Sequence, residues 1–284
     1  MIYKLGPGAS SSGDEMPELP EVETTRRGIE PHVVGKRVAD VVVRQPLLRW
    51  PVSEELKPRL TGSRVVSVSR RAKYLFLETG GGKVMMHLGM SGSLGVLKRY
   101  VAHRKHDHLD IVFTDGSLLR FRDPRRFGCV LWLEGDDHAL LRNLGPEPFS
   151  SDFNGQHLHA LSRRKKVAVK SFIMNSRVVV GVGNIYANEA LHLAGIRPGR
   201  AAGRISRLRY DHLADTIKGV LSRAIEAGGT TLRDYVREDG APGYFKQELM
   251  VYGRGKQPCR HCQAILRETK LAGRSTVFCP SCQR

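Results

Sequence analysis

The pattern of hydrophobic and polar positions divides the chain into a strand-rich first half and a helical second half. Between residues 37 and 134, short runs rich in Val, Ile, Leu and Phe are separated by turn sequences such as Asp115-Gly116. Several short strands at this spacing are typical of a β-sandwich. The predicted strands are RVADVVVR, RVVSVSR, KYLFLET, KVMMHL, HLDIVF, SLLRF and CVLWLE.

Two helical patterns accompany these strands. From Pro20, the string PEVETTRRGIE predicts a helix, because proline is tolerated and acidic residues are favoured in a first turn. Pro31 is expected to end it. After Gly145 the character changes, and an amphipathic helix is predicted from apolar residues at helical spacing. These are Leu208, Leu213, Ile217, Val220, Leu221 and Ile225.

The predicted fold class is α+β, with four segments. Residues 1–15 carry Gly and Ser without hydrophobic periodicity, so they predict a disordered leader or a misplaced start. Residues 16–135 would form an N-terminal β-sandwich domain with a leading helix, and residues 136–248 a helical domain. Residues 249–284 would form a terminal ribbon. The glycine-bearing stretch from Gly228 to Phe245 is either a loop over a site or an ordinary connection.

Charge and hydropathy narrow the class of partner. Lys and Arg number 46 against 28 Asp and Glu, a formal charge of +18, which attracts a polyanion such as nucleic acid. No apolar run approaches the roughly 20 residues that span a bilayer. The first fifteen residues lack the apolar segment of a secretory signal. A cytoplasmic protein that does not enter membranes is therefore expected.

The cysteines predict one structural zinc ion. Cys259-x2-Cys262 and Cys279-x2-Cys282 are separated by sixteen residues, a spacing at which each pair presents two thiolates to a tetrahedral Zn²⁺. Four protein ligands leave no open coordination position, so the ion would hold a β-ribbon together. His261 is an alternative ligand. The fifth cysteine, Cys129, lies in an apolar run and is expected in the core.

A glycine-containing turn offers a second candidate site. In VGVGNIYANE, residues 180–189, two glycines precede Asn184 and a helical stretch. Backbone amides at such a turn can hold a phosphate. Alternatively, Asn184 is simply a helix cap.

Four strings together carry a family resemblance: PELPEVE from Pro17, RRAKY from Arg70, HLGMSGS with DPRRFG, and the terminal cysteine pairs. With GPEP, GVGNIYA and GGTT in the same order, the chain from Met16 onward resembles bacterial formamidopyrimidine-DNA glycosylase. The resemblance implies a base-excision repair enzyme that removes oxidised purines, such as 8-oxoguanine and formamidopyrimidines, from duplex DNA and then cuts the abasic strand. It also implies that the helical domain is a helix-two-turn-helix domain.

The resemblance also implies roles for individual residues. Pro17 would be the nucleophile whose secondary amine forms a Schiff base, a cationic electron sink for β,δ-elimination. Glu18 would be the proton donor and Glu21 a supporting carboxylate. Lys73 and Arg274 would donate protons for β- and δ-elimination respectively.

For DNA binding, the resemblance implies a group of intercalating residues and a group that grips phosphates. Met90, Arg125 and Phe127 would fill the gap left by the flipped nucleotide. His87, Lys166, Asn184 and Arg274 would contact the backbone, and a segment from Thr230 to Tyr244 would cap the lesion. Damaged double-stranded DNA is the expected partner of a monomer.

One departure from the family affects the chemistry. The family's nucleophile is N-terminal, whereas sixteen residues precede Pro17, and an amide nitrogen has no basic lone pair. The working chain is therefore expected to start at Met16 and to lose that methionine. Two alternatives stand beside this interpretation. One is an endonuclease VIII-like enzyme that prefers oxidised pyrimidines, and the other is a damage-binding protein whose Pro17 stays blocked.

Overall fold

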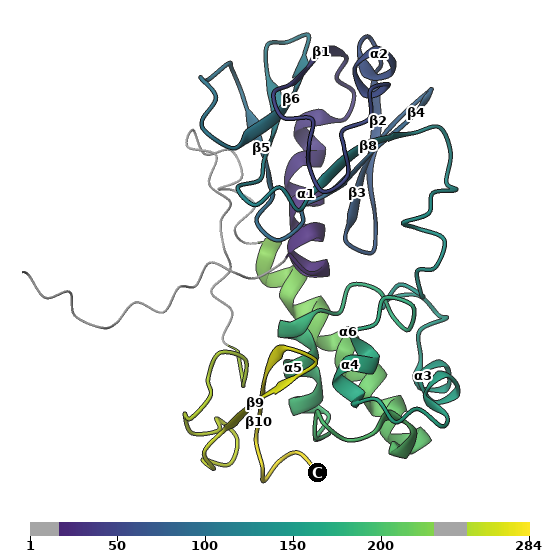
Figure 1. Cartoon of the computed structure of the whole chain (residues 1–284), viewed down its shortest axis with the longest axis vertical. Helices are drawn as coiled ribbons and strands as arrows, with labels where there is room; N and C mark the ends of the chain where they lie inside the picture. The colour runs from purple at the N-terminus through teal and green to yellow at the C-terminus, as the bar shows by residue number, and fades with distance from the viewer. Residues whose placement is uncertain (1–16, 230–248) are drawn as a thin grey trace, which may run out of the picture.

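The computed structural model describes residues 17–229 and 249–284, and it places the two halves of the chain one above the other (Figure 1). The predicted leader, residues 1–15, and the predicted capping segment, Thr230 to Tyr244, lie outside the described residues. The described helices are α1 (Leu19–Val33), α2 (Leu56–Leu60), α3 (Gly155–Ser162), α4 (Val169–Ile173), α5 (Asn184–Leu193), α6 (Arg207–Gly229) and the short 3-10 helix η1 (Ala202–Arg204).

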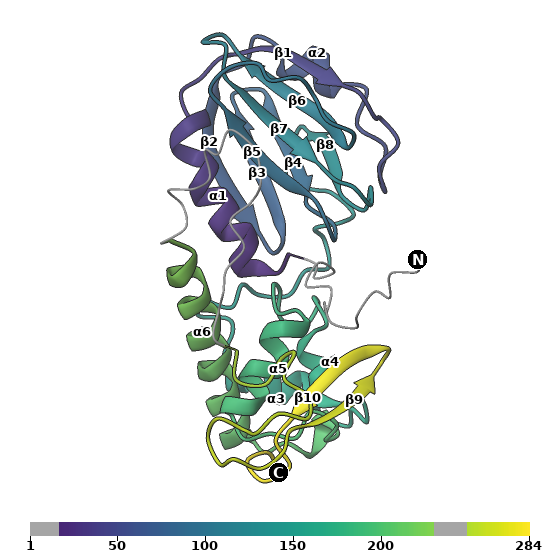
Figure 2. The same cartoon turned by 90° about the vertical axis from the view of Figure 1, so that its left-hand side faces the viewer.

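The upper half is a β-sandwich, as predicted. Two four-stranded antiparallel sheets, with strand orders β1-β6-β7-β5 and β2-β3-β4-β8, face each other (Figure 2). Apolar side chains from both sheets and from α1 share one buried core. The strands are β1 (Val38–Val43), β2 (Val65–Arg71), β3 (Tyr74–Thr79), β4 (Gly82–His87), β5 (Ser93–Leu97), β6 (Asp107–Phe113), β7 (Leu118–Arg122) and β8 (Cys129–Leu133).

In the upper half all seven predicted strands are present, and two short elements of this half were not predicted. Strand β5 escaped because Gly95 interrupts its apolar run, and helix α2 is only five residues long. Cys129 is buried, as expected. It belongs to a second apolar cluster on the outer face of the β2-β3-β4-β8 sheet, which the segment containing Leu140 and Leu141 covers.

Helix α1 begins and ends slightly outside the predicted bounds. A capping box closes its start, in which the Glu18 amide donates to Glu21 Oε2 at 2.8 Å. The expectation that Pro31 ends the helix was wrong by two residues. A proline in the last turn removes only one amide donor, and the turn still closes because Val34 N donates to Glu30 O at 3.1 Å.

The lower half packs α3, α4, α5 and α6 around a separate core. Helix α6 has 23 residues and is therefore about 34 Å long. Its C-terminal part packs against α1 of the sandwich (Figure 2). The predicted apolar face of α6 is buried except at Leu208, which is 79% exposed in the first turn and does not belong to that face.

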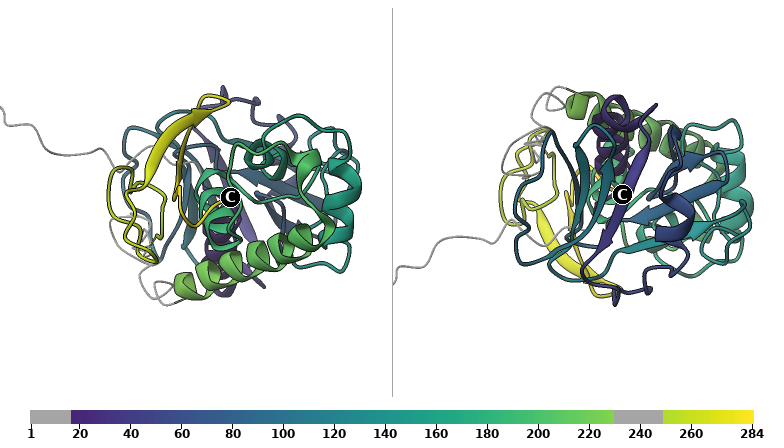
Figure 3. Two further views of the ribbon diagram at one scale, coloured as in Figure 1. Left: turned by 90° about the horizontal axis from the view of Figure 1, so that it is seen from below. Right: turned by 90° about the horizontal axis from the view of Figure 1, so that it is seen from above.

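Strands β9 (Arg267–Leu271) and β10 (Arg274–Phe278) form a two-stranded ribbon (Figures 1 and 3). The ribbon packs against α5 through β10, and α5 also contacts α4 and α6. This ribbon joins the two cysteine pairs, as the sequence predicted. Among the described helices, none combines the length and the apolar character that crossing a bilayer requires.

Candidate active site

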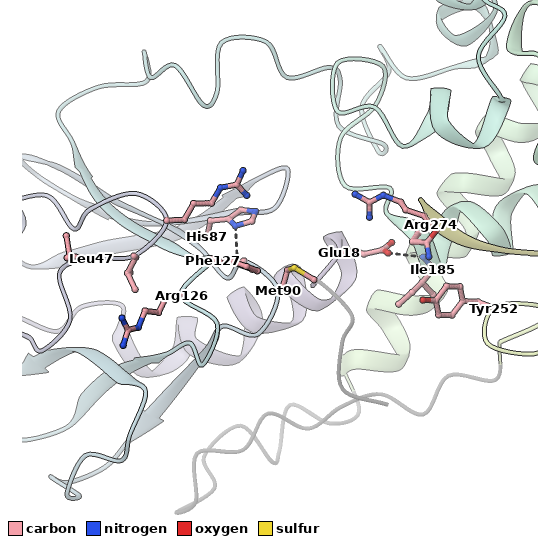
Figure 4. A pocket seen from close by; sticks show the side chains of 13 residues that line it. Glu18, Leu47, His87, Met90, Arg126, Phe127, Ile185, Tyr252 and Arg274 are labelled. Carbon is pink, nitrogen blue, oxygen red and sulfur yellow. Dashed lines mark hydrogen bonds between the residues drawn. The ribbon is translucent and has the colours of Figure 1, made fainter. Parts of the chain in front are cut away.

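A cleft of about 670 Å³ lies between the two halves of the molecule (Figure 4). The sandwich contributes His87, Met90 and Phe127 to its wall, and the lower half contributes Asn184 and Arg274. Glu18, at the start of α1, lies between these two groups (Figure 4). The fold therefore brings residues from seven separate segments of the sequence to one cavity.

The Glu18 carboxylate is held by the first turn of α5. Gly183 N donates to its Oε2 at 2.8 Å and Ile185 N to its Oε1 at 2.9 Å. The expectation that these amides hold a phosphate was wrong, because Glu18 already occupies them. Gly183 is the N-cap of α5, so Asn184 is not the cap either. The anion at this turn comes from the chain itself.

A second carboxylate supports the first. The Oε1 atom of Glu21 accepts a hydrogen bond from the Tyr186 hydroxyl at 2.5 Å, and its Oε2 accepts one from the Glu18 amide. Tyr186 belongs to α5, so Glu21 also joins the two halves of the molecule. The backbone at Glu18 is thus fixed from both sides.

Lys73 lies in the two-residue turn between β2 and β3, where Ala72 has a φ of +56°. The prediction placed it at the start of a strand, which begins one residue later at Tyr74. Burial lowers the pKa of the Lys73 ammonium, although the charges of Glu18 and Glu21 oppose this change. Burial also raises the pKa of the Glu18 carboxyl to about 7, against the effect of Lys73. The two groups therefore interact electrostatically.

The three predicted intercalating residues come together at the lower end of the sandwich. Met90 follows β4, and Arg125 and Phe127 lie in the loop between β7 and β8. Phe127 is 41% exposed, and the Arg125 guanidinium lies 5.1 Å from its ring centre. Phe127 lines the cleft, so the pair presents an exposed aromatic ring with an adjacent cation at its edge.

The four predicted zinc ligands form one cluster. The Sγ atoms of Cys259, Cys262, Cys279 and Cys282 all lie within 4.8 Å of one another. Zinc–sulfur bonds of about 2.3 Å place tetrahedral sulfurs about 3.8 Å apart, so this donor set fits one Zn²⁺. The alternative ligand His261 is exposed and outside the cluster.

Comparison with known proteins identifies the family. The model of the formamidopyrimidine-DNA glycosylase N-terminal domain matches residues 16–130, and that of the H2TH domain of the same glycosylase matches residues 144–236. The chain belongs to the formamidopyrimidine-DNA glycosylase family. A third model, described as a zinc finger found in FPG and IleRS, matches residues 256–284.

Curated members of the formamidopyrimidine-DNA glycosylase family match nearly the whole chain. The enzyme of Alcanivorax borkumensis is 59% identical over 270 residues, and that of Xanthomonas campestris pv. campestris (strain B100) is 56% identical over 271. Each match covers 95% of this chain and 100% of the relative. A crystal structure of the Lactococcus lactis enzyme with N7-benzyl-Fapy-dG DNA is 34% identical, with a TM-score of 0.85 over 94% of this chain and 100% of that one.

Two structural features of this glycosylase site were not predicted as such. Glu147, in the GPEP string, accepts hydrogen bonds from Arg70, Arg71 and the amide of Ala72 at 2.6 to 2.9 Å, and so holds the turn that carries Lys73. The GPEP string contributed to the family resemblance, but the sequence alone assigned no role to Glu147.

The second feature orders the intercalating loops. The buried Asp123 accepts hydrogen bonds from the Ser91 hydroxyl at 2.7 Å and from Gly128 N at 2.8 Å. Ser91 Oγ in turn accepts from Arg125 N at 3.1 Å. The loop after β4 and the loop after β7 are thereby joined. Lys166, in contrast, is exposed between α3 and α4 and does not line the cleft.

His87 has an environment that favours its neutral form. Gly89 N donates to its Nδ1 at 3.0 Å, so that nitrogen carries no proton. Burial lowers the pKa of His87 and the charges of Lys73 and Arg49 act in the same direction, so that together they bring it to about 4. The remaining nitrogen, Nε2, then carries the proton and is a hydrogen-bond donor.

This environment predicts a pH-dependent loss of stability. Unfolded His87 binds its proton near its ordinary pKa of 6.5, whereas the folded form resists protonation down to about pH 4. Acidification through this range therefore favours the unfolded state, by about 2 kcal/mol between pH 7 and pH 5. Urea unfolding should show this loss for the natural chain relative to His87→Gln. Equal pH dependence in both proteins would contradict the assignment.

Proposed function

We propose that this chain is a bifunctional DNA glycosylase and abasic-site lyase that removes oxidised purines from duplex DNA. The observation that carries the proposal is the shared cleft. It brings Glu18, the neighbour of Pro17, together with the exposed Phe127 and with Arg274. A nucleophile, an intercalating side chain and a cation that binds phosphate would thus contact the same DNA strand.

In the proposed reaction, the secondary amine of Pro17 attacks C1′ of the flipped nucleotide, the glycosidic bond breaks and the base leaves. The nitrogen loses its proton, and the sugar ring then opens because the C1′–O4′ bond breaks and O4′ takes up a proton, which leaves a C=N bond between C1′ and Pro17. The resulting imine is cationic and accepts the electron pair released when a C2′ proton is lost, so the 3′ phosphate leaves. A second elimination expels the 5′ phosphate. Glu18 would exchange protons with the opened sugar, and Lys73 and Arg274 would serve the two eliminations.

The DNA contacts follow from the same arrangement. Met90, Arg125 and Phe127 would replace the extruded nucleotide, and His87 and Asn184 would hold flanking phosphates. Asn184 would donate to a phosphate oxygen through its side-chain Nδ2, because an amide oxygen only accepts hydrogen bonds. Lys166 would contact the backbone farther from the lesion. Zinc, when bound to the four cysteines, would hold the ribbon that carries Arg274.

We also propose the chain's division and its working state. Boundaries after residues 135 and 248 are supported by the end of β8 at Leu133 and by the separate core of the terminal ribbon. A monomer suffices, because one chain supplies every residue assigned to the cleft. The bacterial relatives support work in the bacterial cytoplasm, where the chromosomal DNA lies.

Substrate choice tests the proposal against the endonuclease VIII-like alternative. A solved structure of the Lactococcus lactis enzyme holds DNA with an oxidised pyrimidine, so the measurement must compare rates. We expect single-turnover excision of 8-oxoguanine to exceed that of thymine glycol in a matched duplex by at least about tenfold. A faster reaction with thymine glycol would favour the pyrimidine enzyme. Binding to abasic DNA with neither excision nor strand cleavage would indicate a damage-binding protein.

A further inference from the structure

Strand β10 has one edge that β9 does not cover. Among the described strands, β10 pairs only with β9, so every second backbone group of β10 points away from the ribbon. Two buried side chains from the lower half form hydrogen bonds with backbone groups on this free edge. Lys170 of α4 donates to Ser275 O at 2.7 Å, and Asn188 of α5 accepts from Val277 N at 3.0 Å.

Asn188 also makes a second contact that Lys170 does not. Its Nδ2 donates to the carbonyl of Asn184 at 2.7 Å, one turn earlier in α5. Asn188 is fully buried, and both ends of its amide are hydrogen-bonded. One side chain therefore ties the first turn of α5 to the strand that begins with Arg274.

These two tied segments carry the phosphate-binding candidates. Asn184 and Arg274 line the same cleft, and the first turn of α5 also holds Glu18. Arg274 is exposed at the start of β10, so the register of this strand on α5 determines where its guanidinium lies. The zinc cluster holds the ribbon together but does not by itself set this register.

We propose that Asn188 is a positioning residue that holds Arg274 in register with Asn184 on one DNA phosphate. The inference rests on the proposed function, because that function assigns both residues to the DNA backbone. An amide is required, since one acceptor and one donor are used at once. Aspartate keeps the acceptor but faces the Asn184 carbonyl with a second oxygen, and alanine keeps neither bond.

Two measurements on Asn188→Ala test the proposal. The first is the affinity for a duplex containing tetrahydrofuran, an abasic analogue that needs no chemistry. We expect it to weaken about tenfold, because a small misplacement of a charged group is costly. The second is the ratio of δ- to β-elimination products on an abasic duplex. We expect this ratio to fall about tenfold, because Arg274 is displaced, while base excision changes less.

Controls separate positioning from folding. Zinc content and melting temperature are measured for each variant, and Asn188→Asp serves if the alanine variant does not fold. Asn154→Ala is the matched control, because Asn154 also accepts a backbone hydrogen bond, from His157 N, but at the start of the remote α3. Its affinity and product ratio should stay at natural values.

The outcomes are distinct. Loss of zinc in step with loss of affinity would overturn the proposal, because Asn188 would then only stabilise the ribbon. Unchanged affinity and product ratio would overturn it as well. If the natural chain forms no cleavage product, the proposed function fails, and the affinity for the tetrahydrofuran duplex still decides the role of Asn188.

Discussion

A chain that begins at Pro17 is expected to be trapped on abasic DNA by borohydride, and the same chain with residues 1–16 attached is expected not to be. Borohydride reduces the imine to a stable amine, so trapping reports the covalent intermediate directly. In the longer chain the nitrogen of Pro17 belongs to an amide, which cannot attack C1′. The difference should therefore be complete rather than partial.

The measurement needs the intact mass of both proteins, because removal of the first sixteen residues in the host would make them identical. Binding of the tetrahydrofuran duplex by both chains shows that the cleft is formed. Trapping of a chain whose mass includes Met1 would exclude Pro17 as the nucleophile. Lys73, whose pKa burial lowers, would then be the next candidate.

Gly183→Ala is expected to reduce base excision by at least about a hundredfold. A Cβ atom at Gly183 would lie 2.1 Å from the Glu18 carboxyl carbon and 2.3 Å from its Oε1, so the carboxylate must leave its place. The backbone of Gly183 is extended and accepts any residue. The effect would therefore come from Glu18 alone, and not from strain at position 183.

Gly199→Ala is the matched control, because its Cβ would meet no atom within 4 Å. A double-mutant cycle with Glu18→Ala keeps the prediction testable if excision is lost for another reason. The cost of Gly183→Ala in unfolding free energy should shrink when the Glu18 side chain is absent. Equal costs in both backgrounds would show that the substitution acts elsewhere.

Local sequence patterns predicted most elements of this fold, but they did not predict the contacts between distant segments. The CxxC pairs and the strand runs are short-range signals, and both were confirmed as structure. The prediction that the backbone amides of residues 183–186 bind a phosphate was wrong, because such a turn can bind any anion, including a carboxylate of the same chain. Nothing in the string VGVGNIYANE indicates that Glu18, 165 residues earlier in the chain, is the anion that binds there.

The same reason explains what was missed at the site. Glu147 and Asn188 each hold a functional segment by accepting hydrogen bonds from backbone amides. Every residue except proline has such an amide, so the sequence does not show which amide a side chain will bind. The resemblance to a family named the residues that touch DNA. It could not name those that hold them, because such a role depends on which strand edge or turn a side chain meets after folding.

The hydrogen bonds from α5 to Glu18 and Glu21 also limit how this protein can be recombined. The carboxylates belong to the segment that begins the sandwich half, and their donors, Gly183, Ile185 and the Tyr186 hydroxyl, belong to the other. A chimera that joins the sandwich of one family member to the helices of another must therefore inherit positions 18, 21 and 183–186 from a compatible pair. The two halves have separate cores, but a chimera keeps these hydrogen bonds only if both halves carry compatible residues at these positions.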